Sequence, residues 1–435
     1  MRRKIVLAFL MALCCLSFSG CLPQSSEDLF ALPQQPAEYY TLQSHIDAVL
    51  RAGGEYSAPV SGDHRQAVQL VDLNSDGQEE AIVFIRTQGE KPLKIYIYEQ
   101  TEDGYEEAAV IEGAGSAFES VSYCQMDTAL GLEMVVGRQV SDQVPQLLSV
   151  YAFHDMQVTE LLNASCISHT VANLDNDGLQ ELLLFRTDED SAVGLAEYYR
   201  WNENALELSG SADMTAPLTA DSIRRLIFGL MQEDTPAVFL TNTYEESSVV
   251  TDVFILDGDT FKNVSTLGVN DAAQVRYRNV YAADIDEDGL IELPQPVTLN
   301  AYPGLTAQPL FKLQWYNLRS DGSRDEKQAT FHNYTDGWYV ELLPEWEKGL
   351  AVGYVLDEAQ LPCYSFCRNG SGPLFSIYAF SASDDKTLAE GNGRFLLAEK
   401  GDVSYYGRLL ASDISPEQLQ DVFRFIYTDW NSGEV

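Results

Sequence analysis

Cysteines and basic residues are scarce in this sequence, and each scarcity excludes a class of protein. Only 7 of the 435 residues are cysteine, and three of these fall within the first 21 positions, so a fold built on disulfide bonds is excluded. The other four show no C-x-x-C or Cys/His spacing of a zinc site and are expected to be buried free thiols. The 27 Lys and Arg stand against 66 Asp and Glu, and the net charge of −39 argues against a nucleic-acid partner.

Sequence motifs of common enzymes are also missing. The chain contains no G-x-S-x-G, no H-E-x-x-H and no phosphate-binding P-loop. Its five histidines are scattered, and His169 is expected to be a half-buried strand residue. Acidic pairs suited to glycoside hydrolysis could form in space, but 66 acidic residues make their presence uninformative. The sequence therefore favours a non-catalytic protein and leaves an enzyme open.

Long apolar runs are absent except at the N-terminus. Three basic residues at positions 2–4 precede an apolar run from Ile5, which ends in the small residues before Cys21. This order is typical of a secretory signal peptide, and its end resembles a bacterial lipobox. We expect residues 1–20 to be removed and Cys21 to carry a lipid anchor on the extracytoplasmic face of the cell membrane. An ordinary signal peptide cleaved nearby is the alternative.

Residues 21–38 are rich in proline and glutamine, and they predict a linker that holds the protein off the membrane. Removal of residues 1–20 takes away three basic and no acidic residues, which shifts the net charge from −39 to −42.

Three acidic loops carry the clearest chemical signal, at residues 72–80, 173–181 and 284–292. Each has oxygen-bearing side chains at loop positions 1, 3, 5 and 9 and glycine at position 6, where a sharp bend needs a positive φ. Calcium takes six to eight oxygen ligands, which such a turn can supply. One such loop would be a hairpin turn; three with the same pattern predict Ca²⁺ sites.

The loops differ from EF-hands, because position 12 lacks the closing glutamate and the flanking residues indicate strands rather than helices. A glutamate stands at position 9 instead, and the backbone carbonyl of position 7 is expected to add one ligand. The predicted ligands are Asp72, Asn74, Asp76, Gln78 and Glu80 in the first loop, Asn173, Asp175, Asp177, Leu179 and Glu181 in the second, and Asp284, Asp286, Asp288, Leu290 and Glu292 in the third.

The spacing of the loops predicts a repeat. They start 101 and 111 residues apart, which suits two repeats of about 50 residues in each interval. Degenerate copies then lie at 125–133, which keeps Asp127 and Glu133, and at 229–237, although residues 222–231 could also form a short helix. Alternating apolar residues between the loops indicate four strands per repeat. The sequence therefore predicts a mainly β protein, a β-propeller of about five four-stranded blades; a β-sandwich or β-solenoid is the alternative.

The loops, D-x-[DN]-x-D-G-x-x-E between strands, resemble FG-GAP or VCBS repeats of integrin-α-like propellers. The resemblance covers about 60–325 and implies calcium binding and a role as an adhesion or recognition scaffold. Glutamate at position 9, where aspartate is more usual, and Asn173 in place of a charged ligand depart from the pattern.

A different pattern follows residue 325. Short alternating strands and one terminal helix predict an α+β domain over 326–435, behind a propeller with a short N-terminal helix over 39–325. Ser415, Pro416 and Gln418 form a capping pattern, followed by an apolar stripe. The stripe comprises Leu419, Val422, Phe423, Ile426 and Trp430. The aromatics Trp338, Tyr339 and Trp346 are expected in the core, with an exposed sugar- or peptide-binding surface as the alternative.

Two functions are compatible with these sequence features. The first is a membrane-anchored, calcium-binding recognition protein with an unknown protein or glycan ligand. The alternative is an exported hydrolase or lyase that acts on glycans through carboxylates in the propeller channel.

Overall fold

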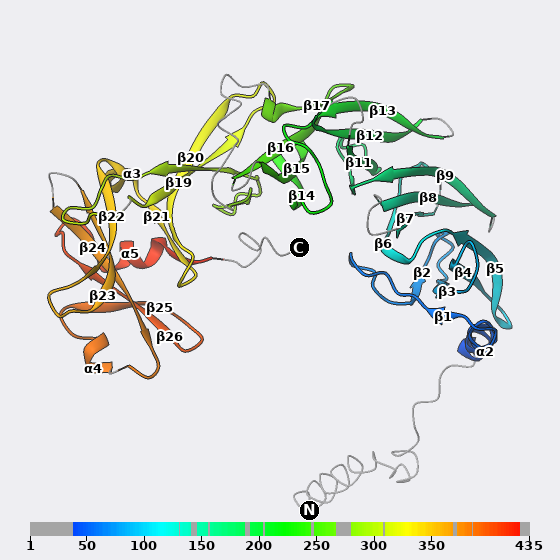
Figure 1. The fold of residues 1–435 in the computed structure, drawn as a ribbon, viewed down its shortest axis with the longest axis horizontal. Helices are drawn as coiled ribbons and strands as arrows, with labels where there is room; N and C mark the ends of the chain where they lie inside the picture. Colours follow the sequence, from blue (N-terminus) through cyan, green and yellow to red (C-terminus); the bar gives the residue numbers. More distant parts are fainter. Residues whose placement is uncertain are drawn as a thin grey trace, which may run out of the picture. The chain divides into compact units, whose positions relative to one another are not determined.

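The structure is a computed structural model of the chain (Figure 1). It describes residues 38–129, 131–140, 146–154, 157–187, 192–202, 205–244, 248–266, 280–307, 309–368, 372–384 and 386–426. The signal peptide of residues 1–20, the lipidated Cys21 and all but the last residue of the linker lie outside the described residues. No described helix is long and apolar enough to cross a membrane.

The protein is mainly β, as predicted, and its strands form antiparallel sheets of four or five strands. The chain divides into two compact units. The first contains residues up to Ala58 together with Gln66–Asp72 and Asp76–Gly113, and the second contains Pro59–Arg65, Leu73–Ser75 and the chain from Ala114 on.

The first unit holds one sheet and the predicted N-terminal helix. Helix α2 (Glu38–Arg51) buries Leu42 and Ile46 against Tyr98 and Tyr105 and ends before Gly53, which has a φ of 97°. Strand β3 pairs with β1, β2 and β4, and β4 pairs with β5. The strands of this first sheet are β1 (Glu55–Tyr56), β2 (Val68–Val71), β3 (Glu80–Arg86), β4 (Leu93–Thr101) and β5 (Gly104–Gly113).

The second unit contains three four-stranded sheets in which each strand pairs with the next in sequence. The second sheet has β6 (Ala117–Cys124), β7 (Glu133–Gln139), β8 (Gln146–His154) and β9 (Gln157–Cys166). The third has β10 (Ser168–Ala172), β11 (Glu181–Thr187), β12 (Gly194–Asn202) and β13 (Ala205–Asp213). The fourth has β14 (Ile223–Gln232), β15 (Thr235–Tyr244), β16 (Ser248–Asp257) and β17 (Thr260–Asn263), followed by the 3₁₀ turn η1 (Val264–Thr266).

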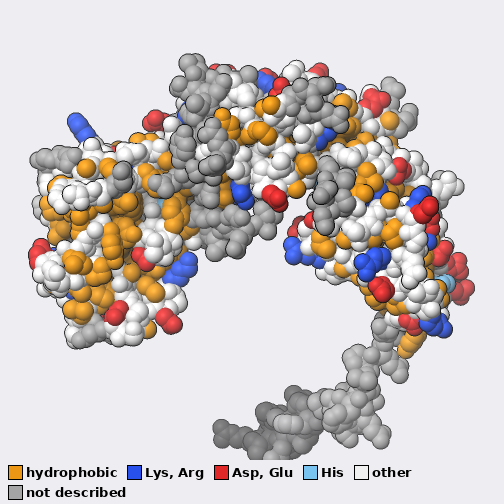
Figure 2. Space-filling view, in the orientation of Figure 1, with side chains coloured by type: hydrophobic (Ala, Val, Ile, Leu, Met, Phe, Trp, Pro, Cys, Tyr) orange, Lys and Arg blue, Asp and Glu red, His pale blue; other side chains and the backbone are white. Residues whose placement is uncertain are grey.

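Two five-stranded sheets complete the second unit. The fifth has β18 (Leu293–Thr298), β19 (Phe311–Leu318), β20 (Arg324–Asn333), β21 (Trp338–Leu342) and β27 (Phe423–Phe425). The sixth has the order β22-β23-β24-β26-β25, from β22 (Leu350–Leu356), β23 (Pro362–Arg368), β24 (Gly372–Ser381), β25 (Arg394–Lys400) and β26 (Val403–Leu409). Short helices α3 (Pro344–Glu347), α4 (Lys386–Ala389) and α5 (Pro416–Val422) lie between these strands. Figure 2 shows hydrophobic side chains gathered at the surface over the sixth sheet.

Apolar clusters join neighbouring sheets of the second unit, and strand alternation explains how. In β11, Leu182 and Leu184 pack with the second sheet, whereas Leu183 and Phe185 point the other way and pack with the fourth. Both faces of such a strand are buried, so its sequence is continuously apolar instead of alternating. The fifth and sixth sheets share a further cluster that includes Trp338.

Two predictions about single elements need correction or refinement. The C-terminal helix begins as predicted, with Ser415 and Gln418 in a complete capping box, but it ends at Val422. Phe423 and Phe425 pair with β21 as strand β27 instead, because there their rings pack on Trp338 and Tyr405. Trp430 lies outside the described residues. Residues 223–232 form strand β14, so the alternative of a short helix at 222–231 is wrong.

The predicted core aromatics Trp338, Tyr339 and Trp346 are buried. The predicted boundary between residues 325 and 326 falls inside β20, which pairs with β19 on one side and β21 on the other. The fifth sheet therefore contains residues from both sides of that boundary.

Candidate metal centre

The three acidic loops share one backbone shape. Loop 72–80 joins β2 to β3, loop 173–181 joins β10 to β11, and loop 284–292 leads into β18 after a bridge between Ala283 and Glu292. In each, position 4 and the glycine at position 6 adopt positive φ. The angles are 57° at Ser75 and 88° at Gly77, 61° at Asn176 and 95° at Gly178, and 61° at Glu287 and 88° at Gly289. The predicted bend at position 6 is confirmed, and a second one at position 4 accompanies it.

The carboxylate at position 5 stabilises this shape in all three loops. It accepts a hydrogen bond from the backbone N–H of position 7, with N···O distances of 2.8 Å for Gln78 on Asp76, 2.7 Å for Leu179 on Asp177 and 2.9 Å for Leu290 on Asp288. Such side-chain bonds to a nearby N–H are typical of aspartate turns. One oxygen of each position-5 carboxylate is therefore occupied by a hydrogen bond that stabilises the turn.

The glutamate at position 9 is buried and ties the loop to its start. One oxygen of Glu181 accepts the N–H of Leu174 at 2.7 Å, and one oxygen of Glu292 accepts that of Ile285 at 3.1 Å. Glu80 is fully buried as well. In the second and third loops the glutamate thus has one oxygen engaged by the backbone.

The second loop, 173–181, brings its acidic side chains together. Oxygens of Asp175, Asp177 and Glu181 lie within 4.8 Å of one another beside a cavity of about 120 Å³, which Arg200 also lines. The buried Oδ1 of Asn173 has no hydrogen-bond partner within the described part of the chain. Burial raises the pKa of Glu181 to about 8, and its two acidic neighbours add to the shift. A bound cation would offset this unfavourable concentration of negative charge.

The third loop, 284–292, forms a similar cluster, but it already has a cation beside it. Oxygens of Asp284, Asp286 and Glu292 lie within 4.8 Å of one another. Lys327 on β20 forms a close ion pair with Asp288 and lies 3.5 Å from Asp286. This lysine holds the pKa of Asp288 below its ordinary value, whereas burial raises the pKa of Glu292 to about 7.

Two of the acidic side chains in the third loop have further partners. Both oxygens of Asp284 accept backbone N–H groups, from Asp288 at 3.1 Å and Gly289 at 2.9 Å. The second oxygen of Glu292 accepts the side-chain amide of Asn317 at 2.6 Å. Lys327 and Asn317 come from strands 35 and 25 residues beyond Glu292, and no loop motif could have indicated them.

In the first loop, 72–80, the same backbone bonds occupy the carboxylates. Asp72 accepts the N–H groups of Asp76 at 3.1 Å and Gly77 at 3.0 Å, as Asp284 does in the third loop. Asn74 is half-buried, and Gln78 is exposed. The convergent carboxylate clusters are those of the second and third loops.

The degenerate copies keep the framework of the loop and lose the acidic set. In 125–133, Glu133 accepts the N–H of Met126 at 2.7 Å, and Asp127 accepts that of Ala129 at 2.8 Å. The copy at 229–237 is a strand–turn–strand with no carboxylate at position 1, 3 or 9. Both copies lie between the first and second strands of their sheet, as predicted by the repeat.

A series of backbone hydrogen bonds links the loops of successive sheets, which the sequence did not reveal. The donor is always the N–H of position 8: Leu132 donates to the carbonyl of Leu73, Gln180 to Gln125 and Ile291 to Leu230, each at 2.8 Å. In the copy at 229–237, position 8 is Pro236, which has no N–H.

The donor set at the second and third loops consists of oxygen atoms, which are the preferred ligands of hard divalent cations. These two clusters could therefore hold a metal ion.

Comparisons with known proteins do not identify a family. The sequence matches no protein-family description and no curated protein. Among solved structures, rhamnogalacturonan lyase YesW is similar with a TM-score of 0.31 and 10% identity over 73% of this chain and 76% of the lyase. Sqt1 of Chaetomium thermophilum has a TM-score of 0.31 and 10% sequence identity, over 82% of this chain and 98% of Sqt1. The rhamnogalacturonan lyase of Bacillus licheniformis has a TM-score of 0.29 and 9% sequence identity, over 73% of this chain and 90% of the lyase. Likenesses of this strength carry no argument about function.

Proposed function

We propose that this protein is a calcium-binding β-propeller scaffold of the FG-GAP/VCBS type that acts by recognition rather than by catalysis. One observation carries the proposal: three loops at the same place in three sheets adopt one backbone shape, and two of them gather oxygen ligands. A turn needed only for connection has no reason to conserve a buried glutamate and three further oxygen positions.

The choice of calcium follows from the ligand geometry. Calcium lies 2.3–2.6 Å from its oxygens, so two ligands on opposite sides of the ion are about 5 Å apart. The oxygens of each cluster lie within 4.8 Å of one another, a separation compatible with Ca²⁺ and also with the smaller Mg²⁺. Magnesium binds at about 2.1 Å and demands a stricter octahedron, which a loop with one carboxylate oxygen already engaged by the backbone supplies poorly.

The propeller assignment is supported by the repeat of the sheets. In the second, third and fourth sheets each strand pairs antiparallel with the next in sequence, and every acidic or degenerate loop leads directly into a strand of its sheet. A radial array of four-stranded sheets places equivalent loops of successive repeats next to one another. The backbone bonds between successive loops are consistent with this arrangement.

Export through the N-terminal segment completes the proposal. A signal peptide over residues 1–20 and a lipid on Cys21 would place the scaffold on the extracytoplasmic face of the membrane. Calcium is abundant there, and sites with dissociation constants of about 10⁻⁴–10⁻³ M suffice in extracellular modules. Mass spectrometry of the protein from a bacterial membrane fraction would show a lipid-modified Cys21 at the N-terminus, and an unmodified N-terminus elsewhere would refute the anchor.

Calcium binding is tested by thermal unfolding in chelator and in millimolar calcium, with calorimetric titration for stoichiometry. We expect calcium to raise the melting temperature, and Asp177→Ala to remove most of the binding at the second loop because it deletes a ligand. Its matched control is Asp234→Ala, an exposed acidic residue in the degenerate copy at 229–237. Equal melting temperatures in chelator and calcium would show that the loops are connecting turns without a metal-binding role.

A further inference from the structure

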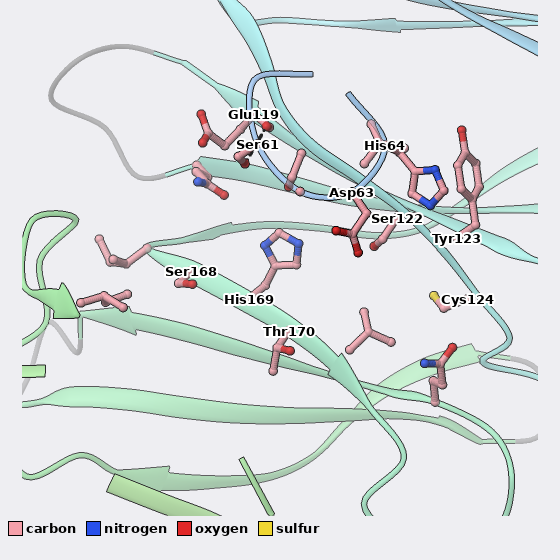
Figure 3. Close-up of a pocket in the computed structure, with 18 of the residues that line it drawn as sticks. Ser61, Asp63, His64, Glu119, Ser122, Tyr123, Cys124, Ser168, His169 and Thr170 are labelled. Atoms are coloured by element: carbon pink, nitrogen blue, oxygen red, sulfur yellow. Dashed lines mark hydrogen bonds between the residues drawn. The ribbon is translucent and has the colours of Figure 1, made fainter. Parts of the chain in front are cut away.

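A cavity of about 670 Å³ lies in the second unit, away from the carboxylate clusters (Figure 3). Its walls come from β6, β10 and the start of β14, together with residues 61–64. Cavities of 300–1,000 Å³ hold ligands of drug size, so this one is large enough for a small organic molecule.

The walls of this cavity are strand edges. Strands β6, β10 and β14 are each the outermost strand of their sheet. Consecutive residues of β6 and β10 therefore line the cavity, since an edge exposes backbone N–H and C=O groups as well as side chains. Part of the β6 edge is covered, because Val60 and Ser61 donate backbone N–H groups to Phe118 and Glu119 at 3.2 and 2.8 Å. These bonds hold residues 61–64 in place as a wall.

Hydroxyl and amide groups dominate the polar part of the lining. They belong to Ser61, Ser120, Ser122, Ser168, Thr170, Gln146 and Gln180. Two of them, the Oγ of Ser120 and the Oε1 of Gln146, are buried and have no hydrogen-bond partner among the described residues. Figure 3 shows Asp63, Ser122 and His169 around a common space. The lining thus offers both donors and acceptors to a ligand.

The charge of the lining excludes one class of ligand and favours another. Asp63 and Glu119 contribute carboxylates, and none of the described residues that line the cavity is Lys or Arg. Burial lowers the pKa of His169 to about 4, so this ring is neutral at pH 7. An anionic ligand, such as a uronic acid, would be repelled by the two carboxylates, with no Lys or Arg among the described lining residues to pair with it. Carboxylates do, however, form strong charge-assisted hydrogen bonds with hydroxyl donors.

Apolar side chains alternate with these polar groups. Val121, Ile167, Val171 and Ile223 line the same space, and Tyr123 adds an aromatic ring. A sugar ring has hydroxyls around its edge and C–H groups on its faces, so it matches a lining of this mixed kind. A polyamine would pair with the carboxylates and make no use of the other polar groups. A fatty acid would leave the polar groups without hydrogen-bond partners, at a cost in free energy.

We propose that this cavity binds a neutral sugar, whose hydroxyls pair with the carboxylates and hydroxyls of β6, β10 and residues 61–64 and with the amides of Gln146 and Gln180. The inference rests on the proposed recognition role and supplies its ligand class. It does not require that the ligand touch the clustered carboxylates, which do not line the cavity.

The test starts with a glycan array that carries neutral, uronic-acid and amino-sugar glycans, probed with the labelled full chain in millimolar calcium. We expect neutral glycans to be bound and uronic-acid glycans to be rejected. Binding of the uronic-acid or amino-sugar glycans alone would overturn the proposal, as would an array without any signal. Calcium-dependent melting is measured on the same preparation, so loss of the metal-binding scaffold is recognised separately from loss of sugar binding.

Site-directed variants then locate the bound neutral glycan by calorimetric titration. The double variant Ser122→Ala, Thr170→Val removes two lining hydroxyls without changing side-chain size much, and we expect affinity to fall roughly tenfold or more. The control Ser209→Ala, Thr159→Val makes the same changes at exposed positions of β13 and β9. Melting curves confirm that both variants are folded, and equal affinities of the two would place the sugar outside this cavity.

Discussion

At the scale of single residues, the position-9 glutamates show how one side chain serves two purposes. Glu181 and Glu292 each accept a backbone N–H of their own loop and also belong to an acidic cluster, and Glu292 accepts the side-chain amide of Asn317 as well. The sequence predicted these residues as ligands, but it could not show the backbone bond, which depends on the fold of the loop. It also could not predict the lysine beside the third loop.

Lys327 is expected to weaken calcium binding at the third loop. Its ammonium pairs with Asp288 and Asp286, so an incoming cation must displace it and is repelled by it. Lys327→Met keeps the length of the side chain and removes the charge. We expect the calcium affinity of one site to rise several-fold in a calorimetric titration, with no change at the second loop. The control is Lys262→Met. It removes a lysine that pairs with Asp257, and neither residue is near a predicted ligand in the sequence.

His332 gives the fold an acid-sensitive component. It is buried against Tyr339, with ring centroids 5.0 Å apart, and both of its nitrogens lack a hydrogen-bond partner in the described structure. Burial lowers its pKa to about 3. The unfolded chain takes up a proton below about pH 6.5, whereas the folded chain stays neutral until about pH 3. Stability contributed by the neutral ring is therefore lost as the pH falls from 6.5 toward 3, by up to about 1.4 kcal/mol per pH unit.

The variant His332→Phe should remove this loss, because phenylalanine fills the same space without a titrating nitrogen. Urea unfolding at pH 7 and pH 4.5 measures it: the stability difference between the two pH values should shrink relative to the parent chain. His45→Gln, at an exposed position, should leave the difference unchanged. An identical pH dependence in His332→Phe and the parent would show that this ring does not titrate on unfolding.

At the scale of elements, the continuous apolar runs of β11 and β15 are explained by their two covered faces, and such runs identify a strand that neighbouring sheets enclose. The end of the C-terminal helix could not be predicted in the same way. Phe423 continues the helical stripe in sequence, and only the presence of an unpaired edge on β21 makes a strand the better state for Phe423–Phe425. Local sequence patterns thus predicted the start of this helix, whereas its end is set by a tertiary contact that such patterns do not contain.

A buried acid adds polar contacts to the apolar junction of the third and fourth sheets. Asp252 on β16 accepts the N–H of Thr215 at 3.0 Å and the side-chain amide of Asn263 at 2.8 Å. Asn263 in turn donates to the carbonyl of Asp213 at the end of β13, at 3.0 Å. These bonds connect the two sheets, whose loops lack the position-8 backbone link because Pro236 has no N–H.

Asp252→Ala should therefore destabilise the protein by several kcal/mol, since it leaves two or more buried donors unpaired at about 1–3 kcal/mol each. Asp257→Ala on the same strand removes an exposed carboxylate paired with Lys262, and such pairs contribute about 0–1 kcal/mol. Denaturant unfolding of both variants makes the comparison. Similar losses in the two would mean that the buried network contributes no more than a surface ion pair.

At the scale of the whole molecule, the excess of acidic residues dominates. A net charge of −39 repels itself in the folded state, and two filled calcium sites would offset about four charges. The net charge follows directly from the amino-acid composition. The pairing of strands into sheets followed from the repeat, but the assembly of the sheets depends on contacts between residues far apart in sequence, which no local pattern encodes.

Salt should therefore stabilise the chain most when calcium is absent. In chelator, a rise from about 0.01 to 0.5 M NaCl shortens the screening length from about 30 Å to less than 10 Å, and we expect the melting temperature to rise by several degrees. In millimolar calcium the rise should be slightly smaller, because two filled sites would offset about four of the negative charges. Choline chloride controls for specific binding of sodium, and a melting temperature that falls with either salt would contradict this account.

The backbone bonds between successive loops have a consequence for how the repeats can evolve. A link made by a main-chain N–H and a main-chain carbonyl is indifferent to nearly every side-chain substitution, so a copy can drift until its ligands are gone and still hold its neighbour. The copy at 125–133, which no longer has a full acidic set, retains its links on both sides. Only proline at position 8 removes such a link. The sets of oxygen ligands can thus be lost one repeat at a time, whereas the backbone links between repeats tolerate most substitutions.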